Sequence, residues 1–313
     1  MELTTDNQKQ EAVRLLKELS KRHQSISFEE YEKKVLDSLE AKREVTADQL
    51  DNMLILAAVE RIGSQEPDWT YVAADIYLSK LYRASAESRG TDPGKGYGLF
   101  YEMIALLEKM GIYDTRLLQK YSKEEIDSLE RIMDPERDGL FTYIGIVTIA
   151  ERYLAKSYSG EFIELPQERF MIIAMTLLAD EPEKYRLSLI QEAYWALSNL
   201  YMTVATPTLA NAGKSYGQLS SCFIDTVEDD LRSIYDSNTD VSTLSKNGGG
   251  IGIYLGKIRS RGSDIKGFKG VSSGVIPWMK QLNNTAVSVD QLGQRQGAIA
   301  VYLDVWHKDI FPF

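Results

Sequence analysis

The chain has 313 residues, enough for one large domain or two ordinary ones, and 43% of them are hydrophobic. Its formal net charge of −10 argues against a general nucleic-acid binder or a protein of acidic membrane surfaces, because phosphate contacts need a surplus of Lys and Arg. A small anionic ligand is not excluded, since a local cluster of two or three cations can hold it.

Neither a signal peptide nor a membrane span is expected. The first residues lack a basic segment and an apolar segment, and the most apolar run, residues 171–179, is about half of what a bilayer span needs. The single cysteine, Cys222, cannot form an internal disulfide. His23 and His307 have no partner at metal-ligand spacing, so we interpret both as structural or surface residues and expect no metal site. A soluble, cytoplasmic protein is the expectation.

The first two-thirds of the chain predict one helix after another. Two capping boxes, Thr46 with Gln49 and Ser122 with Glu125, mark helix starts. Prolines predict three further starts: a helix opened by Pro67, one over residues 167–179 after Pro166, and one from Pro182 to about residue 201.

The pattern changes near residue 205, and we place a domain boundary near residues 200–205. Short β-type runs at 222–226, 250–255 and 298–305 alternate with helical stretches at about 229–247 and 273–290. Strand–helix–strand order of this kind predicts an α/β layer or barrel.

Two segments of this second region admit both a functional and a structural interpretation. The glycine run 248–252 does not fit the dinucleotide spacing, so it is either a tight turn or a close backbone approach to a ligand. Four cations fall within eleven residues, and they form either a phosphate clamp or a solvated basic loop: Arg259, Arg261, Lys266 and Lys269.

Two further features also remain open on residue type alone. Asp229 and Asp230 precede a predicted helix, where a carboxylate either caps the helix or accepts hydrogen bonds from ribose hydroxyls. Cys222 by itself is either a small buried hydrophobe or a catalytic thiol.

Read together, residues 205–311 resemble the large, catalytic subunit of class I ribonucleotide reductases. The stretches that carry the resemblance are ATPTLANAG (205–213), QLSSCFI (218–224), SKNGGGIG (245–252), KIRSRGS (257–263), QLGQRQGA (291–298) and WHKDIF (306–311). Segments 113–118 and 134–141 are similar to the helical domain of that family. The resemblance covers most of the chain and is weak before residue 45.

The resemblance implies an α+β to α/β fold, in which an all-helical domain precedes the first half of a ten-stranded α/β barrel. It divides the chain into an N-terminal helical region over 1–90, a helical domain over 91–204, and the half barrel with its specificity site over 205–313. The N-terminal region lacks the basic hairpin of the family's ATP cone, so that cone is expected to be degenerate or absent.

In that family a thiyl radical removes the ribose 3′-hydrogen, and a cysteine pair then reduces the 2′-carbon and becomes a disulfide. The resemblance implies that Cys222 is one of the reducing pair, which must be a thiol to supply electrons and leave a bond that can be reduced again. The implied substrate-binding residues are Thr206, Ser221, Gly249 and Arg295, the last on the loop 291–297 that would relay effector identity to the substrate.

The resemblance also implies an allosteric site for a deoxynucleoside triphosphate or ATP. Asp229 and Leu231 would hold the sugar and base of the effector, while Arg259 and Lys266 would bind its phosphates. The helices at 229–247 and 273–290 would pair with those of a second copy, giving a homodimer.

The radical cysteine and the second reducing cysteine belong to family sequence that would follow Phe313. The leading hypothesis is therefore a part of a ribonucleoside-diphosphate reductase that is inactive alone. It would need a separate C-terminal fragment and a small subunit that carries the metal-radical cofactor, with no cofactor resident in this chain. The alternative hypothesis is a non-catalytic module that binds deoxynucleotides for regulation or assembly. A truncated form of an ordinary full-length enzyme, or a degenerate helical protein without a ligand, is a further possibility.

Overall fold

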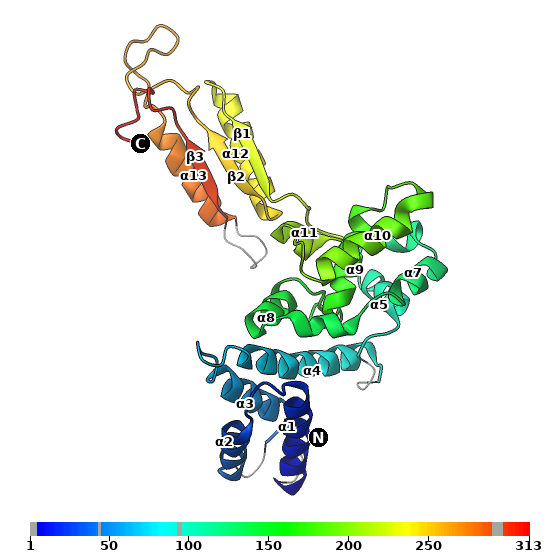
Figure 1. Ribbon diagram of the computed structural model, residues 1–313. Helices are drawn as coiled ribbons and strands as arrows, with labels where there is room; N and C mark the ends of the chain where they lie inside the picture. Colours follow the sequence, from blue (N-terminus) through cyan, green and yellow to red (C-terminus); the bar gives the residue numbers. More distant parts are fainter. Residues whose placement is uncertain (1–4, 43–44, 93–95, 290–296) are drawn as a thin grey trace. The chain divides into compact units, whose positions relative to one another are not determined.

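The computed structural model describes residues 5–42, 45–92, 96–289 and 297–313. The chain divides into two compact units, Met1–Thr203 and Val204–Phe313, and each is described by itself. Figure 1 colours both units along the sequence.

The first unit is helical throughout its described part. Its elements are α1 (Thr5–Arg22), α2 (Glu29–Glu40), α3 (Ala47–Val59), α4 (Trp69–Arg89), α5 (Phe100–Lys109), α6 (Arg116–Lys120), α7 (Lys123–Glu130), the 3₁₀ helix η1 (Pro135–Leu140), α8 (Tyr143–Arg152), α9 (Pro166–Leu177) and α10 (Glu183–Ser198).

The helix starts predicted from caps and prolines are confirmed. Thr46 and Gln49 exchange both capping-box hydrogen bonds at the start of α3, and Ser122 and Glu125 do the same at the start of α7. Pro166 occupies the first turn of α9, where its missing N–H costs nothing. Local backbone chemistry thus sets these boundaries.

The N-terminal helices share an aromatic core. Trp69 is fully buried and lies about 5 Å from the rings of Phe28 and Tyr31, with ring centroids 5.2 and 4.8 Å away. Trp69 opens α4, which packs against both α3 and α8. The long helix α4 therefore joins the first helices to the rest of the unit.

A buried polar network surrounds the first turn of α9. Glu168 receives a bidentate pair of hydrogen bonds from Arg89 and one from the backbone N–H of Leu165. Asp138 accepts hydrogen bonds from Tyr82, Tyr97 and Gln167 at 2.6, 2.6 and 2.7 Å. Buried charges are tolerated only when they are paired and hydrogen-bonded in this way.

The second unit contains a three-stranded parallel sheet in the order β1-β2-β3. Its elements are α11 (Thr206–Asn211), β1 (Cys222–Thr226), α12 (Leu231–Lys246), β2 (Gly250–Tyr254), α13 (Ile276–Ser288) and β3 (Ile299–Tyr302). The register places Cys222 opposite Gly250, and Ile251 opposite Ile299. The three predicted strands are confirmed, whereas the short helix α11 was not expected.

One face of the sheet is covered and the other is open. Helices α12 and α13 contact each other and pack against the strands around a core that includes Ile251, Ile253 and Leu282 (Figure 1). On the opposite face Ile224 of β1 and Tyr302 of β3 are exposed. The fold class is confirmed: an all-helical part precedes a parallel α/β sheet consistent with the first half of a barrel.

No helix in the described part of the chain combines the length and apolar character needed to cross a membrane.

The network around α9 predicts a specific pH dependence of stability. Burial raises the pKa of Asp138 to about 6, although hydrogen bonds from Tyr82, Tyr97 and Gln167 lower it. Because the folded state holds this proton up to higher pH than the unfolded state, the stabilisation is complete below the ordinary pKa of 3.8 and is lost as pH rises through about 6. Relative to Asp138→Asn, the parent should lose about 2 to 3 kcal/mol of unfolding free energy over that range. Urea unfolding of both proteins at a series of pH values measures this difference in unfolding free energy. A difference that does not change with pH would contradict the prediction.

Candidate functional site

The described residues form a cavity at the carboxyl ends of the parallel strands. Its volume is about 610 Å³, and we call it the α12 cavity. It is lined by the start of α12, the loop that follows β2 and the first turn of α13: Asp229, Asp230, Leu231, Arg232, Ile234, Ile258, Arg259, Ile265, Lys266, Val271, Ser272, Ser273, Gly274 and Trp278. Parallel strands bring their following loops to one edge of a sheet, which is where ligands bind in open α/β folds.

The two acidic residues before α12 have separate roles. The Asp230 carboxylate caps the helix by accepting a hydrogen bond from the backbone N–H of Ser233 at 3.0 Å. The Asp229 carboxylate instead accepts two hydrogen bonds from Arg259. One comes from the side-chain Nε at 2.7 Å and the other from the backbone N–H at 3.1 Å. The capping interpretation therefore applies to Asp230, which leaves Asp229 as the carboxylate paired with the cationic loop.

Hydrogen bonds hold the Arg259 side chain in place but, within the described residues, do not use all of its N–H donors. Besides its contacts with Asp229, it donates from Nη1 to the carbonyl of Asp264 at 2.9 Å. A guanidinium has five N–H groups, and three have a partner within the described residues. Asp229 and Arg259 are both only partly exposed, so the guanidinium is oriented at the cavity wall with donors left for an anion.

The loop after β2 is closed by its own hydrogen bonds. The backbone N–H groups of Gly262 and Ser272 pair with Ser272 and Ser263 carbonyls at 2.9 and 3.1 Å. Asp264 accepts from the N–H of Gly270 at 2.9 Å. Lys266 lies at the tip with φ +50°, exposed and on the cavity lining. The glycine-rich basic segment is thus an ordered loop that carries two cations at one cavity.

The remaining wall of the α12 cavity is apolar. Leu231 is 64% exposed although it begins α12, and Trp278 of α13 faces Tyr235 in an edge-to-face contact at 6.3 Å. Ile258 and Val271 complete this side. A lining that combines apolar side chains with an acidic and a basic group suits a ligand that has a flat ring, a hydroxyl-bearing part and an anionic part.

The sequence-predicted thiol lies at the other end of the sheet. Cys222 is exposed as the first residue of β1, and the Ser221 hydroxyl lies 3.4 Å from its sulfur. Gly249, just before β2, is buried, and an added Cβ would lie 2.8 Å from the Phe223 ring. Close packing by Phe223 therefore accounts for this glycine.

The described structure brings the predicted site residues together in two groups. Asp229, Leu231, Arg259 and Lys266 line one cavity, whereas Ser221, Cys222 and Gly249 lie at the amino ends of β1 and β2. Thr206 begins α11, which is tied to the segment before Cys222 by the Thr208 hydroxyl, a donor to the Leu219 carbonyl at 3.0 Å. Arg295 lies outside the described residues.

Sequence reasoning missed several lining residues. Trp278, Ser272 and Gly274 enter the cavity from a loop and a helix start that no single motif marks. The only available signal was their position after the cation-rich segment 259–269.

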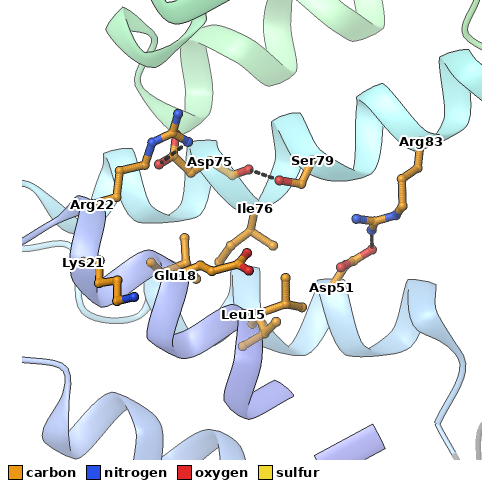
Figure 2. Close-up of a pocket in the computed structure, with 11 residues that line it drawn as sticks. Leu15, Glu18, Lys21, Arg22, Asp51, Asp75, Ile76, Ser79 and Arg83 are labelled. Atoms are coloured by element: carbon orange, nitrogen blue, oxygen red, sulfur yellow. Dashed lines mark hydrogen bonds and ion pairs between the residues drawn. The ribbon is translucent and has the colours of Figure 1, made fainter. Parts of the chain in front are cut away.

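A different cavity lies in the helical unit, between α1, α3 and α4 (Figure 2), with a volume of about 460 Å³. Two ion pairs lie on its wall: Arg83 with Asp51, and Arg22 with Asp75 at 3.3 Å. Burial raises the pKa of Asp51, and Arg83 opposes that shift. With three carboxylates and three cations on its wall, it offers no net charge to an anion. The α12 cavity is the better candidate site.

Comparisons with known proteins agree with this fold. Residues 139–217 match the family model of the ribonucleotide reductase all-alpha domain, and residues 220–313 match that of the ribonucleotide reductase barrel domain. Similar proteins include the ribonucleoside-diphosphate reductase subunit alpha of Treponema pallidum (strain Nichols), 43% identical over 96% of this chain and 35% of the relative. The subunit alpha of Helicobacter pylori (strain ATCC 700392 / 26695) is 40% identical over 88% and 34%. The large subunit of Trypanosoma brucei brucei is 34% identical over 84% and 31%.

The helical segment 139–217 and the parallel α/β region 220–313 therefore match two adjacent domains of one enzyme family. The chain belongs to the ribonucleotide reductase large-subunit family and corresponds to the N-terminal part of that subunit. It spans about a third of the length of these three relatives.

Proposed function

We propose that the chain contributes an effector site and one reducing thiol to a ribonucleoside-diphosphate reductase large subunit. The observation that carries the proposal is the α12 cavity, in which Asp229, Leu231, Arg259 and Lys266 lie on one lining. The proposed ligand is a deoxynucleoside triphosphate or ATP. Asp229 accepts a hydrogen bond from the sugar, Leu231 packs against the base, and Arg259 and Lys266 bind phosphate oxygens.

Local charge supports an anionic ligand. The lining has three cations, Arg232, Arg259 and Lys266, against the two carboxylates Asp229 and Asp230, in a chain whose net charge is −10. Asp230 is engaged at the helix cap, so its charge meets the positive end of the α12 dipole. The cations are therefore the groups best placed to meet phosphate.

The proposed catalytic contribution is the thiol of Cys222. Its exposure at the start of β1 supports access to a substrate and to a second thiol. In the proposed step the two thiols become a disulfide, and their two electrons and two protons reduce the ribose 2′-carbon while its hydroxyl leaves as water. Thr206, Ser221 and the backbone of Gly249 would contact the substrate, and Arg295, which lies outside the described residues, would relay the effector's identity.

The open edges of the sheet support a partner chain that supplies further strands. Within the described residues β1 and β3 each pair on one side only, and the face carrying Ile224 and Tyr302 is uncovered. Further strands are the usual solution for such edges. We propose that a C-terminal fragment of the large subunit supplies them, and that a small subunit holds the metal-radical cofactor that starts the reaction.

A homodimer formed through α12 and α13 would explain how a bound effector influences the substrate site. Gly274, just before α13, lines the α12 cavity, whereas Val289 and Gly297, which flank residues 290–296 in the sequence, lie beyond the other end of that helix. A helix of this length spans about 20 Å. An antiparallel pairing of two copies would bring the end of the partner's α13 toward the cavity, and the exposed side chains Tyr235 and Val287 could contribute to such a contact.

The effector proposal is tested by calorimetric titration with deoxythymidine triphosphate. Arg259→Ala should weaken binding by about tenfold or more, because it removes charge-assisted hydrogen bonds to phosphate. The matched control Lys257→Ala removes the same charge two residues away, at an exposed side chain that pairs with Glu228 and does not line the cavity. It should bind like the parent. Equal losses in both variants, or no binding by the parent, would contradict the proposal.

The catalytic proposal is tested by complementation. The chain is mixed with the part of the Treponema pallidum subunit alpha that follows the matched region, and with a small subunit, and reduction of cytidine diphosphate is measured. Only the full mixture should be active, and Cys222→Ser should abolish that activity while it leaves nucleotide binding unchanged. Activity of the chain alone, or of the Ser variant, would overturn the proposal. Binding without reduction in any mixture would favour the non-catalytic binding module.

A further inference from the structure

A buried carboxylate near the end of the chain lies behind the α12 cavity. Asp309 is only 4% exposed, and it is the one Asp or Glu in the described part of the second unit that is less than a tenth exposed. Burying a charged carboxylate is costly unless its oxygens are hydrogen-bonded. The partners of Asp309 therefore indicate what the burial achieves.

Both oxygens of Asp309 accept backbone N–H groups rather than a cation. The N–H of Arg261 lies 3.0 Å from each oxygen, and the N–H of Val275 lies 3.1 Å from Oδ2. Arg261 belongs to the cationic loop, and Val275 precedes the first residue of α13. One side chain thus joins two segments that are fourteen residues apart in the chain.

His307 fixes a third point on the same loop. The N–H of Asp309 donates to His307 Nδ1 at 3.1 Å, so the other ring nitrogen carries the proton and donates to the Ile258 carbonyl at 2.8 Å. His307 and Asp309 together hold the backbone at Ile258, Arg261 and Val275, and we call this pair the His–Asp clamp. The interpretation of His307 as a structural residue agrees with these contacts.

The clamped segments form two walls of the α12 cavity. Ile258 and Arg259 on one side, and Gly274 on the other, belong to the lining, although His307 and Asp309 do not. Gly274 has φ +75°, and a Cβ added to it would lie 2.2 Å from Asp309 Oδ2 and 2.7 Å from the N–H of Arg261. The glycine is therefore required both by backbone conformation and by the close approach of the carboxylate.

We propose that His307 and Asp309 are positioning residues for the effector cavity: they hold the Arg259 loop against the start of α13, so that Arg259 faces phosphate. The inference rests on the proposed effector function and adds the means by which the site keeps its shape. Neither side chain touches the ligand. Removing either side chain weakens nucleotide binding because it displaces Arg259.

A double-mutant cycle tests this role. Asp309→Ala should weaken deoxythymidine triphosphate binding by about tenfold in calorimetric titration, and Asp309→Asn, which keeps one acceptor oxygen, by less. In the Arg259→Ala background Asp309→Ala should have little further effect, because residues that act through one another are not additive. Phe311→Ala, at a side chain 98% exposed and two residues away, is the control and should bind like the parent.

Limited trypsin digestion without nucleotide provides an independent measurement. Asp309→Ala and Asp309→Asn should be cut faster than the parent after Arg261, and the new cuts should be confined to residues 259–269. If the parent fails to bind nucleotide but the digestion result holds, the effector proposal fails while the clamp stands. Additive losses in the cycle, or unchanged cleavage at Arg261, would overturn the positioning role.

Discussion

The parallel pairing of three short strands is the constraint on which the candidate site depends. Because β1, β2 and β3 run in the same direction and in register, the segments that follow Thr226, Tyr254 and Tyr302 leave the sheet at one edge. Tyr254 donates a hydrogen bond to Asp304, which ties the end of β2 to the segment after β3 and raises the pKa of the tyrosine. Asp229 in the first segment, the cations in the second and the His–Asp clamp in the third lie near one another because parallel strands bring the segments that follow them to one edge of the sheet.

Local signals in the sequence predicted the elements well where backbone chemistry decides them. The capping box at Thr46 and the β-type run 222–226 correspond to observed boundaries, because caps and alternation act over a few residues. The pairing of Asp229 with Arg259 could not be read from local pattern, since it joins residues thirty positions apart. The packing of Gly249 against Phe223 was missed for the same reason: a glycine run alone does not say whether ligand or side chain makes the close approach.

The two ends of the sheet have different chemistry, and the helices connect them. The α12 cavity lies at the carboxyl ends and Cys222 at the amino end, separated by a five-residue strand, or about 15 Å. Helices α12 and α13 run the length of this gap, packed on one shared core. A ligand that orders the start of both helices can bias what lies at their far ends, which is the physical requirement for an effector that acts on a distant substrate.

Hydrogen–deuterium exchange with and without deoxythymidine triphosphate tests whether the loop after β2 and the start of α12 form one nucleotide site. Slower amide exchange with the nucleotide is expected in residues 228–234 and 258–275, because the ligand adds contacts to backbone that lies at the edge of the sheet. Exchange that stays unchanged in both segments, or slows only within the helical unit, would contradict it.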